Sequence, residues 1–474
     1  MKQYIKKIKT VLFLALATSI TSCSIDDIKP FNKLTPDDAV RDEASAQLVL
    51  NGVYNSGRAF DVNFFPLHLA ALGIEGTFST AISGSKGFNT NEVPVDNIFL
   101  TNLYNGHYKI INSCNFLIQE LQNGKAIGIS EERKGEMLSE AKFQRAYAYF
   151  NLLRYFGEFY NLNSTYGVVL RTEFSTKLEA KPRNTVAEVY KLIEDDLLFA
   201  SDKGPIYIDH FYTGSLAAKA LLSKVYLYEG KFAESATLAD DVITNGPNEG
   251  YELEMNYADI FAKSFRSSEV IFAPFTGPDN EGKTAMYQVS RMRSSNALKT
   301  LADAQKGTAN DGSLAGSGSG FDPRYAFAYS DNTKKGNSNG KYPFADNQQS
   351  QGNTLYHLRL GEIYLIKAEA EARRTGGDLD IALESLNDIR FRAGVDLKTL
   401  SDKATLLNDI REEKLLELFF ENGESWFDIV RYVNLGNLTA SSAKASLVSP
   451  NQFVLPIPLQ VIAGNKFIIP NKGY

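Results

Sequence analysis

The sequence predicts a mainly α-helical protein: a tetratricopeptide-like superhelix of helix pairs with long irregular loop insertions and little β-structure. Three observations predict this fold class. Apolar residues recur at i, i+4, i+7 and i+11 in several segments, and that spacing places them on one face of an α-helix. Glycine turns join some of these segments into pairs. Sustained alternation of apolar and polar residues, which is typical of β-strands, is scarce.

The composition is that of an ordinary globular chain. The protein has 474 residues, of which 43% are hydrophobic and 22% are charged. These values exclude a disordered chain, a collagen and a coiled-coil rod. The formal net charge of −6 argues against a nucleic-acid-binding protein, because such proteins normally carry a strongly basic face.

The first 22 residues are predicted to be a lipoprotein signal peptide. Four lysines precede an apolar run from Val11 to Ile20, which is too short to cross a bilayer comfortably. The segment from Ile20 to Cys23 resembles a bacterial lipobox, in which the cysteine thiol carries the lipid. We therefore predict lipidation at Cys23 and a single lipid-anchored body over residues 23–474. Its amino-terminal part extends to about residue 250, and its carboxyl-terminal part begins at about residue 251.

Four segments carry the helical spacing most clearly. Cys114 lies within one of them, so we expect it to be a buried small hydrophobic residue and not a nucleophile. Tyr226, Gly230, Phe232 and Ala236 have tetratricopeptide-repeat spacing, which favours stacked helix hairpins. The four stripes are Ile110, Cys114, Leu117 and Leu121; Val186, Tyr190, Ile193 and Leu197; Phe232, Ala236, Ala239 and Ile243; and Ala382, Leu386, Ile389 and Ala393.

Two stretches interrupt the helical pattern. Residues 60–100 are rich in Phe, Gly, Asn and Thr, and residues 275–350 are rich in Gly, Ser and Asn. Both are predicted to be long loops or small irregular insertions between helices. Loops of this length inside a compact protein are usually functional or disordered.

No motif for catalysis, a metal or a cofactor is found. The four histidines, His68, His107, His210 and His357, have no metal-ligand spacing, and each is expected to lie at the surface or to cap a helix. The adjacent Glu412 and Glu413 are expected on a solvated helix face beside basic residues. The protein is therefore predicted not to be an enzyme and to need no cofactor.

Four landmarks together resemble the SusD/RagB family of outer-membrane nutrient-binding lipoproteins. They occur in the same order as in the family, and the resemblance extends from residue 23 to the end of the chain. The landmark segments are mostly scaffold. They are RAYAYFNLLRYFGE (145–158); LRLGEIYLIKAEA (358–370) with LNDIRFRAG (386–394); IREEKLLELFFE (410–421) with WFDIVR (426–431); and LPIP (455–458) with IPNKGY (469–474).

The resemblance implies a lipoprotein on the outer leaflet of the outer membrane. Such a protein caps a SusC-like TonB-dependent transporter, binds an oligomeric nutrient that is usually a glycan, and delivers it to the transporter barrel. No bond is made or broken. In the family the ligand-binding residues come from variable loops, so no site residue can be transferred from the landmark motifs.

Candidate site residues therefore come from the two interrupting stretches. A sugar offers apolar CH faces and many hydroxyls, so its site needs an exposed aromatic platform and nearby polar side chains. The first stretch contains Phe65, Phe78, Phe88 and Asn91. The second contains Tyr287, Arg291, Arg293, Tyr325 and Tyr342.

Three alternatives remain open. The same architecture could bind peptides, as the RagB branch of the family suggests. A lipid-anchored glycoside hydrolase would need two carboxyl groups roughly 5–10 Å apart across a cleft. A repeat scaffold could bind only proteins and have no small-ligand site.

Overall fold

The computed structural model describes residues 36–63, 65–78, 85–177, 179–206, 209–277, 292–305, 322–328, 340–342 and 353–474. The predicted signal peptide and Cys23 lie outside these ranges. Most of the predicted second loop also lies outside them, including Tyr287 and Arg291.

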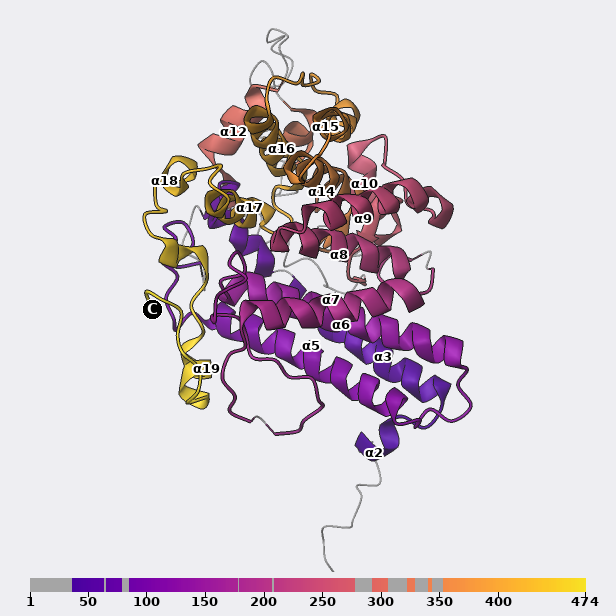
Figure 1. Cartoon of the computed structure of the whole chain (residues 1–474). Helices are drawn as coiled ribbons and strands as arrows, with labels where there is room; N and C mark the ends of the chain where they lie inside the picture. Colours follow the sequence, from indigo (N-terminus) through magenta and orange to yellow (C-terminus); the bar gives the residue numbers. More distant parts are fainter. Residues whose placement is uncertain are drawn as a thin grey trace, which may run out of the picture.

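The amino-terminal part begins with short elements and continues as a row of long helices (Figure 1). The capping box of Thr185 and Glu188 begins one of these helices, and Gly230 ends another with a left-handed φ of 80°. The elements are α2 (Pro36–Ala39), α3 (Glu43–Gly57), α4 (Phe60–Asn63), η2 (Phe65–Ala71), β1 (Gly76–Phe78), α5 (Ile98–Gln122), α6 (Glu131–Phe156), α7 (Val186–Lys203), α8 (Ser215–Glu229), α9 (Phe232–Asn245) and η3 (Gly246–Glu249).

The carboxyl-terminal part combines short strands with a second group of helices. Its elements are α10 (Tyr257–Lys263), η4 (Ser264–Arg266), β2 (Val270–Phe272), β3 (Met292–Ser294), α12 (Asn296–Asp303), α13 (Pro323–Ala328), β4 (Leu358–Arg359), α14 (Leu360–Arg373), α15 (Leu379–Ala393), α16 (Lys403–Leu418), α17 (Glu424–Asn434), α18 (Ala440–Ala443), η5 (Pro450–Phe453) and α19 (Leu459–Gly464).

The long helices stack in sequence order. From α5 to α9, each helix packs against the next, and α14 packs against both α9 and α15. The stack therefore continues across the inserted segments. β-structure in the described ranges is limited to two antiparallel pairs, β1 with β3 and β2 with β4. The predicted fold class, a mainly α superhelix of helix pairs with little β-structure, is confirmed.

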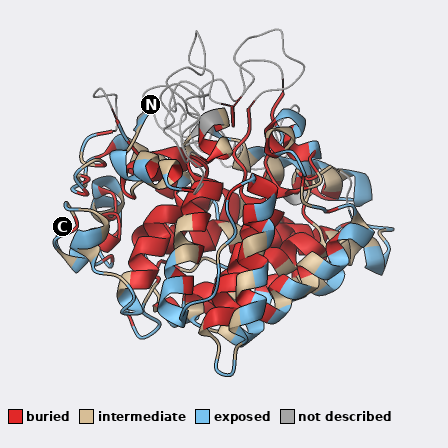
Figure 2. Cartoon of the chain, turned by 90° about the horizontal axis from the view of Figure 1, so that it is seen from above, coloured by how far each residue is buried: buried red, intermediate tan, exposed pale blue. Residues whose placement is uncertain are grey.

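The core lies along the facing sides of these helices (Figure 2). One hydrophobic cluster reaches from Val40 near the start of the described chain to Ile468 near its end. All four predicted apolar stripes lie within helices, in α5, α7, α9 and α15. Cys114 is fully buried as expected, and burial raises the pKa of its thiol. No helix in the described ranges is long and apolar enough to cross a membrane.

The expectation for the histidines is wrong. His68, His107, His210 and His357 are all buried, not at the surface. Nδ1 of His107 lies 2.8 Å from the Leu103 carbonyl, and burial lowers the pKa of this histidine to about 4. The local sequence around each histidine could not show this, because residues from distant segments pack against the rings, as Phe88 does against His68 and Tyr147 does against His357.

The solvated face expected for Glu412 and Glu413 is also incorrect. Glu412 is half-buried, but Glu413 is fully buried and accepts from Arg390 at 2.6 Å. Lys414 is buried too and pairs with Asp428 at 3.0 Å. The physical reason is that α16 is surrounded, because α12, α13, α14, α15 and α17 all pack against it. Charges on such a helix must pair inside the protein.

A buried ion cluster around Glu417 of α16 ties several elements together. Arg324 of α13, Arg359 of β4 and Arg392 of α15 lie 2.7, 2.8 and 2.5 Å from its carboxylate oxygens. These guanidinium groups hold the pKa of Glu417 well below its usual range although burial opposes ionisation. The short helix α13, which has undescribed residues on both sides, is anchored to the body through this cluster.

Candidate functional site

The two interrupting stretches meet in a short β-ribbon. β1 from the first pairs with β3 from the second, with Gly76 opposite Ser294, Thr77 opposite Arg293, and Phe78 opposite Met292. Side chains alternate between the two faces of a strand. Thr77 and Arg293 are therefore neighbours on the outer face of the ribbon, and both are exposed. The ribbon brings residues more than 200 positions apart to one surface.

The α16–α17 turn and the start of α17 bind Glu75, the residue that precedes β1. The fully buried carboxylate of Glu75 accepts from the Phe420 backbone N–H at 2.7 Å and from the Ser425 hydroxyl at 2.6 Å. The Ser295 backbone N–H donates to the Glu75 carbonyl at 3.1 Å. Burial raises the pKa of Glu75 to about 7. One residue therefore joins β1, the end of β3 and the α16–α17 turn.

The other described pieces of the second stretch are fastened to the same place. The Tyr325 hydroxyl lies 2.8 Å from the Ser294 hydroxyl, so α13 is bound to β3. The Tyr342 hydroxyl donates to the Phe420 carbonyl at 2.5 Å, and Lys341 forms an ion pair with Glu421 at 2.7 Å. These described pieces of the second stretch thus gather near α12 and α16, at one end of the molecule (Figure 1). We call the surface formed by β1, β3 and α12 the loop face.

The aromatic residues predicted for the first stretch are packed, not exposed. Phe78 is 8% exposed and Phe88 is fully buried. Both rings contact His68, with ring centroids 5.0 and 5.6 Å away, and Phe99 contacts it from a third direction at 5.1 Å. The alternation of the ribbon turns Phe78 inward, so the expected platform is not presented to solvent. Ligand binding by these rings stays a prediction.

Asn91 has a structural role in this conformation. It is 2% exposed and has a left-handed φ of 59°, which asparagine tolerates better than most residues. Its amide donates to the Leu72 carbonyl at 2.9 Å, and its side-chain oxygen accepts from Ser446 at 2.7 Å. Both polar ends of the side chain are therefore occupied by the protein.

Arg293 alone is exposed among the predicted side chains that the structure describes. Tyr325 and Tyr342 are 3% and 0% exposed, because their hydroxyls bind Ser294 and Phe420. Phe65 begins η2, but its side chain lies outside the described part, as do Tyr287 and Arg291 entirely. Among the described predicted residues, Arg293 is the one placed to contact a ligand without a rearrangement.

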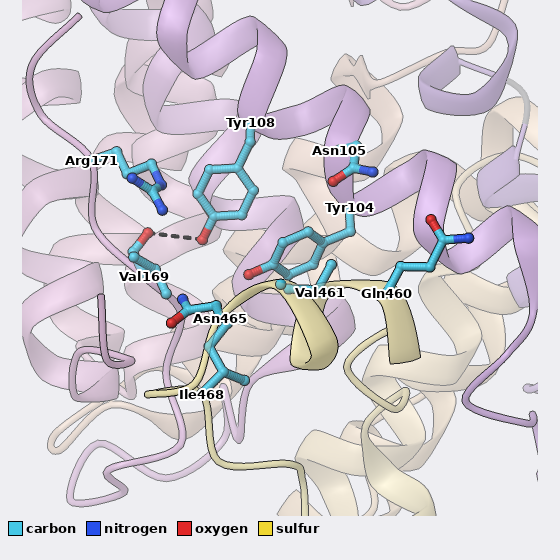
Figure 3. Close-up of a pocket in the computed structure, with 10 residues that line it drawn as sticks. Tyr104, Asn105, Tyr108, Val169, Arg171, Gln460, Val461, Asn465 and Ile468 are labelled. Carbon is cyan, nitrogen blue, oxygen red and sulfur yellow. Dashed lines mark hydrogen bonds between the residues drawn. The ribbon is translucent and has the colours of Figure 1, made fainter. Parts of the chain in front are cut away.

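A second feature was not predicted from the sequence. A pocket of about 200 Å³ lies between α5 and α19, with Tyr104, Tyr108, Val169, Val461 and Ile468 among the residues that line it (Figure 3). The Tyr108 hydroxyl donates to the Val169 carbonyl at 2.8 Å. The sequence shows the i, i+4 spacing of the two tyrosines. It does not show the pocket, because the other lining residues come from segments that are distant along the chain.

The described residues contain no metal-binding arrangement. No group of three or more His, Cys, Asp or Glu side chains within these ranges could hold a metal ion. Two acidic residues near the loop face have structural roles, since Glu75 binds Phe420 and Ser425 and Glu421 pairs with Lys341 and Arg359. The outer face of the β1–β3 ribbon offers a hydroxyl and a guanidinium, which suit binding of polar ligands.

In this protein the helix pairs stack, and the two inserted stretches meet on one face. This arrangement is typical of helical-repeat binding proteins. The chain belongs to the SusD/RagB family. Residues 275–474 match the family model described as the SusD family, and residues 50–227 match the model described as starch-binding associating with outer membrane.

Individual relatives are similar over most of the chain. A SusD-like protein P2 of Formosa agariphila is 25% identical over 99% of this chain and 100% of that protein. A SusD-like protein of Bacteroides ovatus is 27% identical over 70% of this chain and 65% of that protein.

Solved structures share the fold. A SusD superfamily protein from Bacteroides thetaiotaomicron has a TM-score of 0.76 at 24% identity, and the match covers 91% of this chain and 99% of that one. A structure described as a putative sugar binding protein from Bacteroides vulgatus has a TM-score of 0.73 at 23% identity, covering 92% and 99%. These likenesses confirm the helix-pair superhelix.

Proposed function

We propose that this protein is a cell-surface lipoprotein that binds an oligosaccharide or polysaccharide and delivers it to a SusC-like TonB-dependent transporter. The observation that carries the proposal is the β1–β3 ribbon, which brings both inserted stretches to one face. Membership of the SusD/RagB family supports the same function, as do the outer-membrane description of one family model and the sugar-binding description of one similar structure.

The loop face supplies suitable chemistry for a glycan. The Thr77 hydroxyl can both donate and accept, and the Arg293 guanidinium presents several N–H donors in a fixed plane. Both belong to a paired ribbon, so little of their backbone freedom is lost when a ligand binds. Hydroxyl-rich ligands or carboxylate-bearing ligands are both compatible with this pair.

Titration calorimetry of residues 24–474 against a panel of polysaccharides and peptides tests the ligand. We expect saturable binding to at least one polysaccharide. Arg293→Ala should weaken it by about ten- to 150-fold, because hydrogen bonds to charged groups contribute about 1.5–3 kcal/mol. Arg41→Ala is the matched control, since Arg41 is exposed near α2, at the other end of the molecule from α12 (Figure 1). Binding of peptides alone would replace the glycan with the RagB-like alternative.

We infer that the protein binds its ligand without breaking it. No paired carboxylates suited to glycoside hydrolysis were identified on the described loop face. Incubating the purified protein with every polysaccharide that it binds should release no new reducing ends. Release that survives repurification would instead support the hydrolase alternative.

The lipid anchor and the transporter are tested in the native host. Cys23→Ser should move the protein from the membrane fraction to the soluble fraction, because it removes the predicted acylation site. Wild-type protein purified in mild detergent should bring a TonB-dependent transporter with it. Failure to recover any outer-membrane protein would argue against the delivery role while leaving glycan binding open.

A further inference from the structure

The pocket between α5 and α19 is a second place where a small ligand fits. It is separate from the loop face, since α19 and α12 lie at different ends of the molecule in Figure 1. Its volume of about 200 Å³ is below the ~300–1,000 Å³ of sites for drug-sized ligands. It therefore suits a ligand as small as one sugar ring.

Two tyrosines in tilted contact form one wall of the pocket. The ring centroids of Tyr104 and Tyr108 lie 4.8 Å apart with their planes inclined at 42°. Val461 and Ile468 also line the pocket, with α19 opposite the tyrosines of α5 (Figure 3). Burial raises the pKa of both phenols, so both stay neutral at physiological pH, and the Tyr108 hydroxyl already donates to the Val169 carbonyl. Tyr104 is 6% exposed and Tyr108 is half-buried. The Tyr108 ring, opposite aliphatic side chains, therefore supplies most of the apolar contact that the CH face of a sugar ring needs.

The polar residues around the pocket are amides and a cation. Asn105 and Gln460 line it and are exposed, so their amides can exchange water for ligand. Arg171 lies beside the hydroxyl end of Tyr108 (Figure 3) and donates from Nη2 to the Glu179 carbonyl at 2.6 Å. Among the described residues, no carboxylate lies within salt-bridge distance of Arg171.

A second arginine adds to the positive charge. Arg183 lies close enough for its charge to act on Tyr104. Its acceptors are uncharged: the carbonyls of Phe156, Tyr166, Gly167 and Ile469, and the side-chain oxygen of Asn471. Burial lowers the pKa of Arg183 only to about 10, so the group stays charged at neutral pH. The carboxylate of Glu158 acts on the charge of Arg183. Arg171, which lines the pocket, is therefore the charge that favours an anion there.

We propose that the α5–α19 pocket binds a single acidic sugar unit, a pyranose ring bearing a carboxylate or sulfate, with the ring against Tyr104 and Tyr108 and the anionic group toward Arg171. The inference deepens the proposed function and rests on it, because the acidic unit would belong to the same class of nutrient. It differs in place, since the loop face receives the chain and this pocket receives one unit.

Saturation-transfer NMR and titration calorimetry of residues 24–474 with glucuronate and galacturonate test the proposal. We expect weak, saturable binding of at least one uronate, and binding at least tenfold weaker for glucose and galactose. Arg171→Gln should weaken uronate binding about tenfold or more, because it removes a charge-assisted contact. Arg41→Ala should leave it unchanged.

A second variant guards against local disruption of the Arg171 segment. A Cβ built on Gly464, which lines the pocket, meets no atom within 4 Å, so Gly464→Leu can occupy the pocket without a backbone clash. It should also abolish uronate binding at the same melting temperature.

The inference would be overturned by no uronate binding, by equal binding of neutral sugars, or by uronate binding that both variants leave intact. Acetate that competes as well as the uronates would show a simple anion site and would also overturn it.

The two proposals fail separately. Titration of Arg293→Ala with polysaccharides tests the loop face. Titration of Arg171→Gln with single sugars tests the pocket. Loss of polysaccharide binding in Arg293→Ala with intact uronate binding would support two sites. A protein that binds uronate but no polysaccharide would keep the pocket and reject the proposed function.

Discussion

At the residue scale, a single buried carboxyl connects the loop face to the body. Glu75 is 1% exposed, and its side chain and backbone together bind Phe420, Ser425 and Ser295. Because burial outweighs these hydrogen bonds, its pKa is raised to about 7 from the model-peptide value of 4.5. The contacts that attach β1 to the body therefore depend on whether the Glu75 carboxyl group is protonated.

This coupling predicts a pH dependence of stability. Between about pH 4.5 and pH 7 the folded protein keeps a proton that the unfolded chain has released, so the free energy of unfolding falls as the pH rises. The loss approaches about 3 kcal/mol at and above neutral pH. Glu75→Gln should remove this component, because glutamine does not titrate. Denaturant unfolding of both proteins from pH 5 to pH 8 measures it, and parallel profiles would contradict the assignment.

Glu424 illustrates the opposite case, a buried carboxylate kept charged by its partners. Arg154, Lys224 and Tyr228 donate to its two oxygens at 2.9, 2.7 and 3.1 Å. The cations hold its pKa well below the usual range against the cost of burial. Removing it would leave Arg154 buried without its carboxylate, whereas Lys224 would keep Glu362 at 2.8 Å.

Glu424→Ala should therefore reduce the free energy of unfolding by about 3–5 kcal/mol. Asp195→Ala is the control, since it breaks an exposed i, i+4 pair with Lys191 on α7 and should cost less than about 1 kcal/mol. Urea unfolding at pH 7 compares the two variants. Equal losses would show that the buried cluster is not stabilising.

Residue-scale prediction of the site from sequence had a clear limit. The inserted stretches were identified, and Arg293 lies exposed where they meet. The sequence could not show that Phe88 and Tyr342 are buried, because the residues that they contact, His68 and Phe420, lie in other segments. A sequence window shows which residues are aromatic but not which distant element covers them.

At the element scale, two glycines at helix ends differ in why glycine is needed: one for its backbone conformation, the other also for its small size. Gly230 at the end of α8 and Gly423 before α17 have left-handed φ values of 80° and 69°. Around Gly230 an added Cβ meets no atom within 4 Å, whereas at Gly423 it would lie 2.3 Å from the Leu69 Cβ. The first position needs glycine for its backbone alone, and the second also needs the space.

Gly230→Ala should therefore cost about 1 kcal/mol, the backbone penalty. Gly423→Ala should cost a further 1–3 kcal/mol, because η2 must move away from the turn. Chemical denaturation of both variants measures the difference. Similar losses would mean that the contact between η2 and the α16–α17 turn relaxes without cost.

Helices were predicted well because their signal is local. The stripes over 110–121, 186–197, 232–243 and 382–393 lie in α5, α7, α9 and α15. The spacing of Tyr226, Gly230 and Phe232 corresponds to the α8–α9 turn. The three-residue strands β1 and β3 carry no such signal, since their pairing depends on contacts over 200 residues of chain. The buried ion pairs around α16 could not be predicted for the same reason, since Glu417 pairs with arginines from α13, β4 and α15.

At the scale of the whole molecule, the helical stack and the inserted segments divide the work. The stack from α5 to α9 and on through α14 and α15 supplies the core. The α16–α17 turn binds Glu75, Lys341 and Tyr342, and Tyr325 of α13 binds Ser294 of β3. A rigid scaffold with ligand groups on the segments that it positions is a common division in binding proteins.

The central claim is that the ligand binds at the loop face, and hydrogen–deuterium exchange locates binding directly. Residues 24–474 are compared with and without a polysaccharide that they bind in calorimetry. We predict slower exchange at residues 76–78 and 292–296, and unchanged exchange in α7 and α9. Protection confined to the helical stack, with none at the β1–β3 ribbon, would contradict the account.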